Sequence, residues 1–170
     1  MSKTEYFPLV NELGEVIGKA SRLECHSGTF WLHPVVHLHV FNSNGDLYLQ
    51  KRSLNKDIQP GKWDTSVGGH VDYGEDVITA LKREVSEELG IDDFMANYIK
   101  SYKFVSKQEA EFVNCFYTLY DAEIIPDPIE ISEGKFWTFE QIKSAIGMDI
   151  FTPNFEQEFI TVVQHIKIKK

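Results

Sequence analysis

Gly69-His70-Val71-Asp72-Tyr73-Gly74-Glu75, continuing to Arg83-Glu84-Val85-Ser86-Glu87-Glu88-Leu89-Gly90-Ile91, is the stretch that decides the fold. It predicts a glycine turn and then a helix over residues 75–89 that ends at Gly90. Three carboxylates, Glu84, Glu87 and Glu88, have the spacing i, i+3, i+4 and project from one side of that helix. Because like charges so placed repel one another, a cation that prefers carboxylate oxygens, such as Mg²⁺ or Mn²⁺, would stabilise them.

An ordinary solvated acidic patch is the alternative explanation for these carboxylates. Helical angles weigh against it, because Glu84 and Glu88 point with the apolar arc of the helix and Glu87 lies at the edge of that arc. A carboxylate directed at a core costs free energy unless it is paired or bound to a metal. The pattern therefore favours a metal site.

Residues 69–91 resemble the Nudix box: Gly, five residues, Glu, seven residues, Arg-Glu, an aliphatic, any residue, Glu-Glu, any residue, Gly and an aliphatic. Every specified position is filled, by Gly69, Glu75, Arg83, Glu84, Val85, Glu87, Glu88, Gly90 and Ile91. The resemblance implies an α/β fold, the Nudix-type α/β/α sandwich with a mixed β-sheet between helices. It also implies a single Nudix hydrolase domain over residues 1–170, with the box at 69–91.

The family binds metal through the box carboxylates and the backbone carbonyl just before the box glycine. The resemblance therefore assigns metal ligation to Gly68, Glu84, Glu87 and Glu88. For Gly68-Gly69 a tight turn needing positive φ is the structural alternative. Glu75 is out of phase with this face, so we expect a helix-terminal charge and a partner for Arg83.

The general base is open among four carboxylates. Glu87 or Glu84 can take this role, because the family is not uniform about which carboxylate activates water. Glu130 and Glu133 precede Phe136-Trp137, where some relatives carry a loop glutamate. A plain solvated acidic loop is the alternative for both.

The histidines indicate a narrower resemblance. Cys25-His26, Leu32-His33, Pro60-Gly61-Lys62-Trp63 and Gly69-His70 resemble isopentenyl diphosphate isomerase, itself a Nudix-fold enzyme. That isomerase holds a metal with three histidines and two glutamates, and the resemblance assigns a second metal site to His26, His33, His70, Glu109 and Glu111. His37 and His39 have no counterpart, and strand alternation predicts them on one wall of a polar pocket.

The departures from the isomerase decide the chemistry. Its catalytic cysteine stands in Cys-Gly-His, whereas this chain has Gly68-Gly69-His70. Its Nudix box is degraded, whereas this one is complete. The residues thus predict an isomerase-like scaffold with hydrolytic chemistry.

Composition fits a modest soluble enzyme with a sizeable core, at 170 residues, 42% hydrophobic and 25% charged. The net charge of −9 disfavours nucleic-acid and anionic-membrane partners. Cys25 and Cys115 are expected to be reduced and buried in a cytoplasmic protein. The start of the chain does not read as a signal peptide, and no apolar run approaches the roughly 18 residues of a membrane span.

Together these residues predict a Mg²⁺-dependent Nudix pyrophosphohydrolase, with Mn²⁺ as substitute. The substrate expected is a nucleoside diphosphate derivative or related small organic diphosphate. Contacts to it are assigned to the basic residues upstream of the box and to one aromatic, namely Lys51, Arg52, Lys56, Lys62 and Trp63. Trp63 or Trp31 can stack on a base, although a buried core role is favoured for each.

Two other functions stay open. One is an isomerase that uses a replacement acid such as Glu111 or His70. The other is a non-catalytic nucleotide-binding Nudix module, which a complete box argues against because binding alone does not need three metal carboxylates. A homodimer is also left open.

Local patterns predict the remaining elements. A hairpin is expected over residues 6–10 and 16–19, and strands over 35–41, 47–50, 98–105, 112–121 and 136–139. Residues 55–62 read as a polar loop. Helices are expected from about residue 140 and over 154–166.

Overall fold

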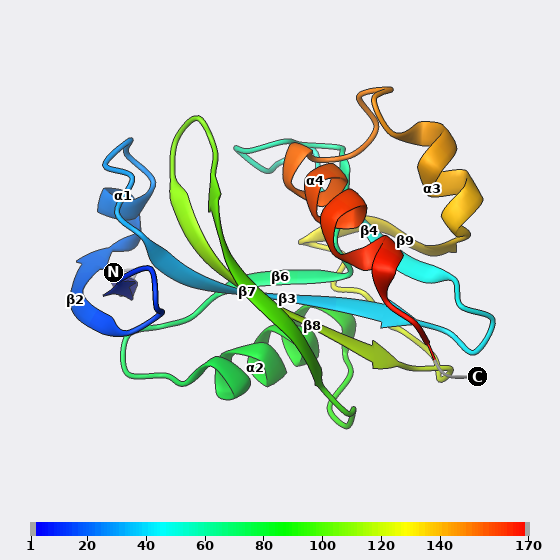
Figure 1. The fold of residues 1–170 in the computed structure, drawn as a ribbon, viewed down its shortest axis with the longest axis horizontal. Coiled ribbons are helices and arrows are strands. Elements are labelled where there is room, and N and C mark those ends of the chain that lie inside the picture. Colours follow the sequence, from blue (N-terminus) through cyan, green and yellow to red (C-terminus); the bar gives the residue numbers. More distant parts are fainter. Residues whose placement is uncertain (1–2, 169–170) are drawn as a thin grey trace. The chain divides into compact units, whose positions relative to one another are not determined.

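The computed structural model describes residues 3–168 (Figure 1). The strands are β1 (Tyr6–Val10), β2 (Val16–Ser21), β3 (His33–Phe41), β4 (Leu47–Arg52), β5 (Trp63–Asp64), β6 (Val67–His70), β7 (Asn97–Val105), β8 (Ala110–Leu119) and β9 (Ile131–Trp137). The helices are α1 (Arg22–Cys25), α2 (Val77–Leu89), α3 (Phe139–Ala145) and α4 (Pro153–Thr161), with a 3₁₀ turn, η1 (Val163–His165).

Two sheets organise these strands. β1 and β2 pair by themselves, and a seven-stranded sheet has the order β5-β4-β3-β8-β7, with β6 on β3 and β9 on β4. The chain divides into two compact units. The first contains the residues up to 37, 68–84 and 98–116, and the second contains 38–67, 85–97 and the residues from 117 on.

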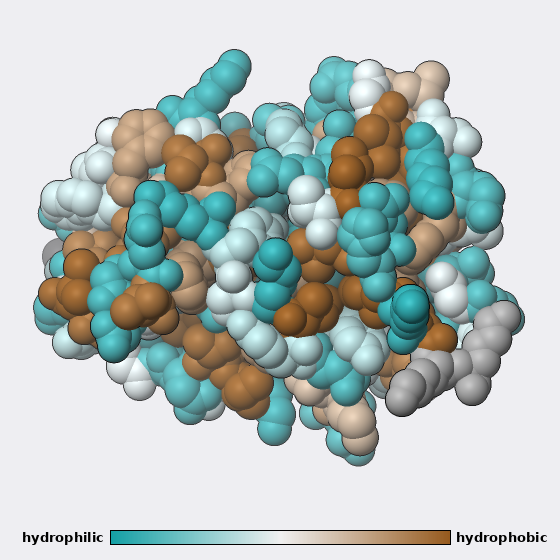
Figure 2. Space-filling view, viewed as in Figure 1, coloured by the Kyte–Doolittle hydropathy of each residue, from teal (hydrophilic) through white to brown (hydrophobic). Residues whose placement is uncertain are grey.

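In the first unit, the N-terminal hairpin leads into α1 and then to His26. The Asn11 side chain closes the turn by accepting hydrogen bonds from the amides of Leu13 and Glu15, both at 3.0 Å. Ser21 begins α1 with a capping box that Glu24 completes. The strand β2 carries exposed Val16 and Ile17, and brown hydrophobic surface is visible over this hairpin at the left of Figure 2.

A dense aromatic core fills the second unit. Its buried members are Phe41, Leu47, Leu49, Trp63, Ile142, Ala145, Phe151, Phe155, Phe159 and Val163. β4 and β9 pair antiparallel, with Leu47 opposite Trp137 and Lys51 opposite Glu133. Thr152 caps α4, and Pro153 occupies the helix start, where its missing amide hydrogen costs nothing.

His39 of β3 was predicted to lie in a pocket wall, but it lies in the interior. Its Nε2 lies 2.5 Å from Glu158 Oε1 on α4, and both side chains are fully buried. A buried carboxylate needs such a partner, because desolvation without one is expensive. His37 is also buried, as is every residue of β3, so the shared face of the two rings stays a prediction. A pocket wall is wrong for His39.

Most predicted elements are present with shifted ends. α2 begins at Val77 rather than residue 75, because Asp76 acts as its N-cap and accepts a 2.8 Å hydrogen bond from the Thr79 amide. Gly90 ends α2 at φ +64° as expected. The predicted helix over 154–166 is α4 followed by η1. Short elements α1, β5 and β6 were not predicted.

The prediction for the acidic segment before Phe136 was wrong. We predicted a loop, but β9 begins at Ile131 and pairs with β4 along its length, so Glu133 is a strand residue. Glu130, just before the strand, forms an ion pair with Lys56. The pairing with β4 outweighs the weak strand propensity of this sequence.

Within residues 3–168, none of the helices has the length and apolar composition that spanning a bilayer requires. A single domain over residues 1–170 stays a prediction, and its first two and last two residues lie outside the described part. Cytoplasmic localisation stays a prediction as well.

Both cysteines are fully buried and neither forms a disulfide among the described residues, as expected. Burial, together with the nearby charges of Glu24 and Glu109, raises the pKa of the Cys25 thiol to about 11. We therefore expect slow reaction of the native protein with a thiol reagent at pH 8, and two reactive thiols after denaturation. Rapid native labelling, or fewer than two thiols in denaturant, would contradict this burial.

Candidate functional site

Four side chains from distant parts of the sequence meet in the first unit. His26 follows α1, His33 opens β3, His70 ends β6, and Glu109 lies just before β8. His26 Nε2 is 2.9 Å from Glu109 Oε2, His33 Nε2 is 3.5 Å from the same oxygen, and His26 Nε2 is 3.1 Å from His70 Nε2. One ligand atom of each residue lies within 4.8 Å of all the others.

Neighbouring groups orient these rings. His33 Nδ1 donates to the Trp31 carbonyl at 2.9 Å, which directs Nε2 toward Glu109. Phe7 stacks on His70, with ring centroids 4.4 Å apart and planes 1° from parallel. The buried His33 Nε2 has no hydrogen-bond partner within residues 3–168. An orphaned imidazole nitrogen facing a carboxylate fits a divalent cation, so this donor set suits a metal.

The electrostatics favour the metal-binding forms of Glu109 and His70, whereas at His33 the contacts with Glu109 and the Trp31 carbonyl outweigh burial and raise the pKa. Burial alone would raise the pKa of Glu109, but the close imidazoles of His26 and His33 outweigh it and hold that pKa well below its usual range. Burial, reinforced by the charges of Arg22 and the other two histidines, lowers the pKa of His70 well below its usual value. An ionised carboxylate and a neutral imidazole are the forms that bind metal.

Glu111 behaves differently from the other four assigned residues. It is not among the ligand atoms that the structure brings together. Burial, and then the charge of Glu109, raises its pKa to about 7. The structure thus brings together four of the five residues that the isomerase resemblance assigns to the second metal site.

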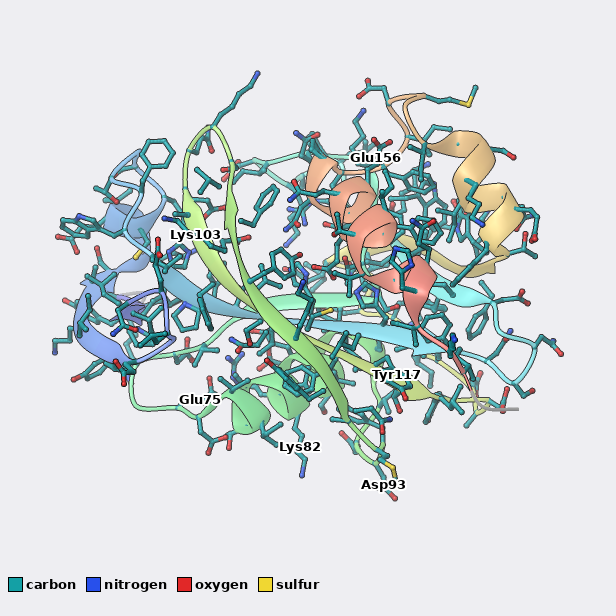
Figure 3. All side chains as sticks on the ribbon, viewed as in Figure 1. Glu75, Lys82, Asp93, Lys103, Tyr117 and Glu156 are labelled. Atoms are coloured by element: carbon teal, nitrogen blue, oxygen red, sulfur yellow. The ribbon has the colours of Figure 1, made fainter. Side chains whose placement is uncertain are left out.

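Arg83 on α2 organises the box. Its guanidinium binds both oxygens of Glu75 at 2.9 and 3.0 Å, as expected, and also Glu84 Oε1 at 2.7 Å and the His70 carbonyl at 3.0 Å. The hydrogen bond with Arg83 lowers the pKa of Glu75 and raises that of the guanidinium. Figure 3 shows Glu75 at the entry to α2, and Lys82 pointing away from that helix.

The tight turn given as the structural alternative for Gly68-Gly69 is not formed. Both glycines lie in β6, and neither has a positive φ. A Cβ at Gly69 would lie 2.1 Å from Glu84 Cδ and 2.5 Å from Glu84 Oε2, so the glycine makes room for a carboxylate. A Cβ at Gly68 would meet His37 at an ordinary 3.5 Å. Of the two, only position 69 excludes a side chain by contact.

The three box carboxylates follow the predicted arc of α2. Glu84 and Glu88 are half-buried, and Glu87 is exposed. Carboxylate oxygens and backbone carbonyls are donors that Mg²⁺ and Mn²⁺ accept. Among residues 3–168, however, these carboxylates do not form one of the groups whose ligand atoms lie within 4.8 Å of one another, so metal binding by Gly68, Glu84, Glu87 and Glu88 stays a prediction.

The residues assigned to substrate already have partners in the second unit. Lys56 pairs with Glu130, Arg52 contacts Asp64 at 3.3 Å, and Lys62 contacts Asp149 at 2.5 Å. Lys51 lies 6.0 Å from the ring of Trp63. A phosphate would therefore have to displace or share these contacts.

Of the two tryptophans, only one has the favoured core role. Trp63 is buried in the core, as favoured, which leaves its ring little surface for stacking. Trp31 is 44% exposed, so the core role favoured for it is wrong.

Comparison with known proteins places this chain in a family. The model of the NUDIX domain matches residues 31–159. The chain belongs to the Nudix family. It is 35% identical over 133 residues to an uncharacterized Nudix hydrolase of Nostoc sp., covering 75% of each chain. It is 30% identical over 153 residues to isopentenyl-diphosphate Delta-isomerase of Streptomyces avermitilis, covering 86% of this chain and 78% of the relative.

The fold prediction is confirmed by a solved structure. The crystal structure of the DR0079 protein of Deinococcus radiodurans matches with a TM-score of 0.79 and 29% identity, over 90% of this chain and 96% of the other. The expected Nudix fold and the isomerase-like branch are therefore both established for this chain.

The Gly69–Glu84 contact gives a test. We expect Gly69→Ala to displace the flexible Glu84 side chain, and so to weaken Mn²⁺ binding about tenfold, while the fold survives with a stability loss of about 1–3 kcal/mol. Isothermal titration with Mn²⁺ and urea unfolding measure the two effects. Gly68→Ala is the matched control for stability, because its Cβ meets only ordinary contacts. Equal stability losses in both variants would refute the steric role of Gly69.

Proposed function

We propose that this Nudix protein hydrolyses a diphosphate bond in a nucleoside diphosphate derivative or related small organic diphosphate, with Mg²⁺. The observation that carries the proposal is the complete box. Because Gly69 has no Cβ, the Glu84 carboxylate fits against β6, where it contacts Arg83. A bound divalent cation neutralises charge on phosphoryl oxygens and lowers the pKa of water. Mn²⁺ is the expected substitute.

The residues divide the remaining work. Glu84, Glu87, Glu88 and the Gly68 carbonyl would hold the cation. Glu87, the exposed member, would accept the proton of the attacking water, with Glu84 as the other box candidate. Outside the box, Glu133 is exposed on β9, whereas Glu130 is engaged by Lys56.

Basic side chains would guide the substrate to an acidic protein. Lys51, Arg52, Lys56 and Lys62 lie on or after β4, and the fork of Arg52 suits a phosphate. The present carboxylate partners of Arg52, Lys56 and Lys62 would hold these three cations in place before substrate arrives. The proposal includes a cytoplasmic protein with a small-molecule substrate and no nucleic-acid partner, in keeping with the net charge of −9.

A specific observation keeps the isomerase as the second candidate. His26, His33, His70 and Glu109 form a metal-competent group, and several relatives carry the isomerase name. Gly68 in place of the isomerase cysteine argues against this activity. The non-catalytic module is disfavoured because ligand binding alone would not require the complete box.

A substrate panel tests the hydrolase proposal. We expect release of phosphate or a monophosphate from at least one nucleoside diphosphate derivative or organic diphosphate when Mg²⁺ is present, and none with EDTA. Product analysis by ion-exchange chromatography distinguishes the bond cleaved. Identical product with and without EDTA would mean that the metal requirement is wrong.

Glu87→Gln tests the proposed base or ligand. We expect kcat to fall about 10²-fold or more with the fold intact, because a carboxylate that binds metal or takes a proton is lost. Without metal, thermal stability should stay level or rise, because one repelling charge has been removed. Turnover near that of the unaltered protein would remove Glu87 from the mechanism.

The isomerase alternative predicts a different product. We expect no useful conversion of isopentenyl diphosphate to dimethylallyl diphosphate with Mg²⁺ or Mn²⁺, measured by NMR. Allylic isomerisation needs an acid and a base on opposite sides of the substrate, and Gly68 positions neither. Turnover comparable to a true isomerase would overturn the hydrolase proposal.

Gly68→Cys is the companion variant. The ordinary 3.5 Å contact to His37 shows that a Cβ is tolerated at this position. Appearance of isomerisation in this variant alone would support an isomerase ancestry for the site.

A further inference from the structure

Gln50, a buried amide on β4, lies against one of the box carboxylates. Its Nε2 donates to Glu88 Oε2 at 2.8 Å and to the Ser66 carbonyl at 3.0 Å. Only 8% of Gln50 is exposed, so this amide is held in the interior. We propose that Gln50 is a positioning residue that sets the direction of the Glu88 carboxylate for metal binding; this inference rests on the proposed function.

Chemistry fixes which way the Gln50 amide points. Its nitrogen faces two acceptors, a carbonyl oxygen and a carboxylate oxygen. Turning the amide over would place its own oxygen against both, which is repulsive. The two amide hydrogens are thereby both used, and Gln50 has a single favourable orientation.

The other side of Gln50 is anchored by a buried serine. Ser66 is fully buried, its Oγ accepts from the Val40 amide at 2.9 Å, and it donates to the Tyr48 carbonyl. Two hydrogen bonds thus hold the Ser66 side chain, and the carbonyl of the same residue is the anchor for Gln50. Through these hydrogen bonds, Ser66 connects Gln50, and with it the Glu88 carboxylate, to the backbones of β3 and β4.

The backbone of Glu88 is fixed separately. Its carbonyl accepts from the Asp127 amide at 2.9 Å, and the next carbonyl, of Leu89, accepts from Ile125 at 3.2 Å. These bonds hold the end of α2 whatever residue occupies position 50. Gln50 therefore acts on the Glu88 side chain rather than on the helix.

An amide suits this task because it is neutral. A lysine or arginine at position 50 would orient Glu88 equally well, but its positive charge would oppose a cation at the same carboxylate. Glutamine donates a hydrogen bond and leaves the negative charge of Glu88 in place. Groups of this kind around metal ligands typically change metal affinity about 10–100-fold when removed.

A double-mutant cycle tests the inference. Gln50→Met keeps the side-chain length and removes both donors, and Glu88→Gln removes the carboxylate. Mn²⁺ affinity is measured by EPR of the free ion. The affinity compared among the variants is that of the sites whose Mn²⁺ binding Glu88→Gln weakens. We expect Gln50→Met to lower the Mn²⁺ affinity of these sites about tenfold or more in the unaltered protein. In the Glu88→Gln background, the same substitution should change that affinity less than about twofold.

Gln157→Met, the same substitution at an exposed position on α4, is the matched control and should leave Mn²⁺ affinity unchanged. An equal loss from Gln50→Met in both backgrounds would overturn the inference, because the effect would then act through the fold. Unchanged affinity in Gln50→Met, with weakened binding in Glu88→Gln, would overturn the inference and leave the proposed function standing. Unchanged affinity in Glu88→Gln would overturn both.

If Gln50→Met does not fold, Gln50→Asn gives the answer. It keeps the polar amide and shortens it by one methylene, so the reach to Glu88 is lost while the polarity of the interior is preserved. We expect weakened Mn²⁺ binding in this variant. Affinity equal to that of the unaltered protein would overturn the inference.

Discussion

The box depends on the guanidinium of Arg83. This cation touches Glu75 with two nitrogens, Glu84 with another, and the carbonyl of His70, so it joins the end of β6, the loop before α2 and the helix itself. A lysine offers a point charge and no planar fork, and it could not make this set of contacts. The acidic face of α2 is therefore built around a fixed countercharge, and the direction of Glu84 follows from it.

A second constraint is steric. Glu84 occupies the space where a Cβ of residue 69 would stand, so the strand β6 passes the helix with only hydrogen on that side. The same strand ends in His70, whose ring stacks on Phe7. The short strand β6 thus places Gly69 against the Glu84 carboxylate and contributes His70 to the group of His26, His33 and Glu109. The two candidate metal sites therefore share a backbone segment.

Sequence reasoning reached the elements whose signal is local. The apolar arc of the helix predicted over residues 75–89 marked α2, and local patterns marked the hairpin of residues 6–10 and 16–19 and the strands over 35–41 and 47–50. Features that depend on distant partners were missed. β9 is acidic and becomes a strand through β4, and Gly69 is explained by a residue fifteen positions later. Gln50 interacts with Glu88 across 38 positions, and its only local signal is a polar residue after the buried run from Leu47. The histidine group was predicted by resemblance alone, and Glu111 stands outside it.

The wide spacing of the histidine group along the chain has a thermodynamic consequence. His26, His33, His70 and Glu109 span 84 positions of sequence, and the unfolded chain rarely brings them together. A cation that binds all four would select the folded ensemble by mass action, with a gain that grows as the logarithm of its free concentration. Closing such long loops is entropically costly in the unfolded state, so the cation would act as a reversible cross-link. The N-terminal hairpin, which contributes Phe7 and leads to His26, would then owe part of its order to the ionic composition of its surroundings.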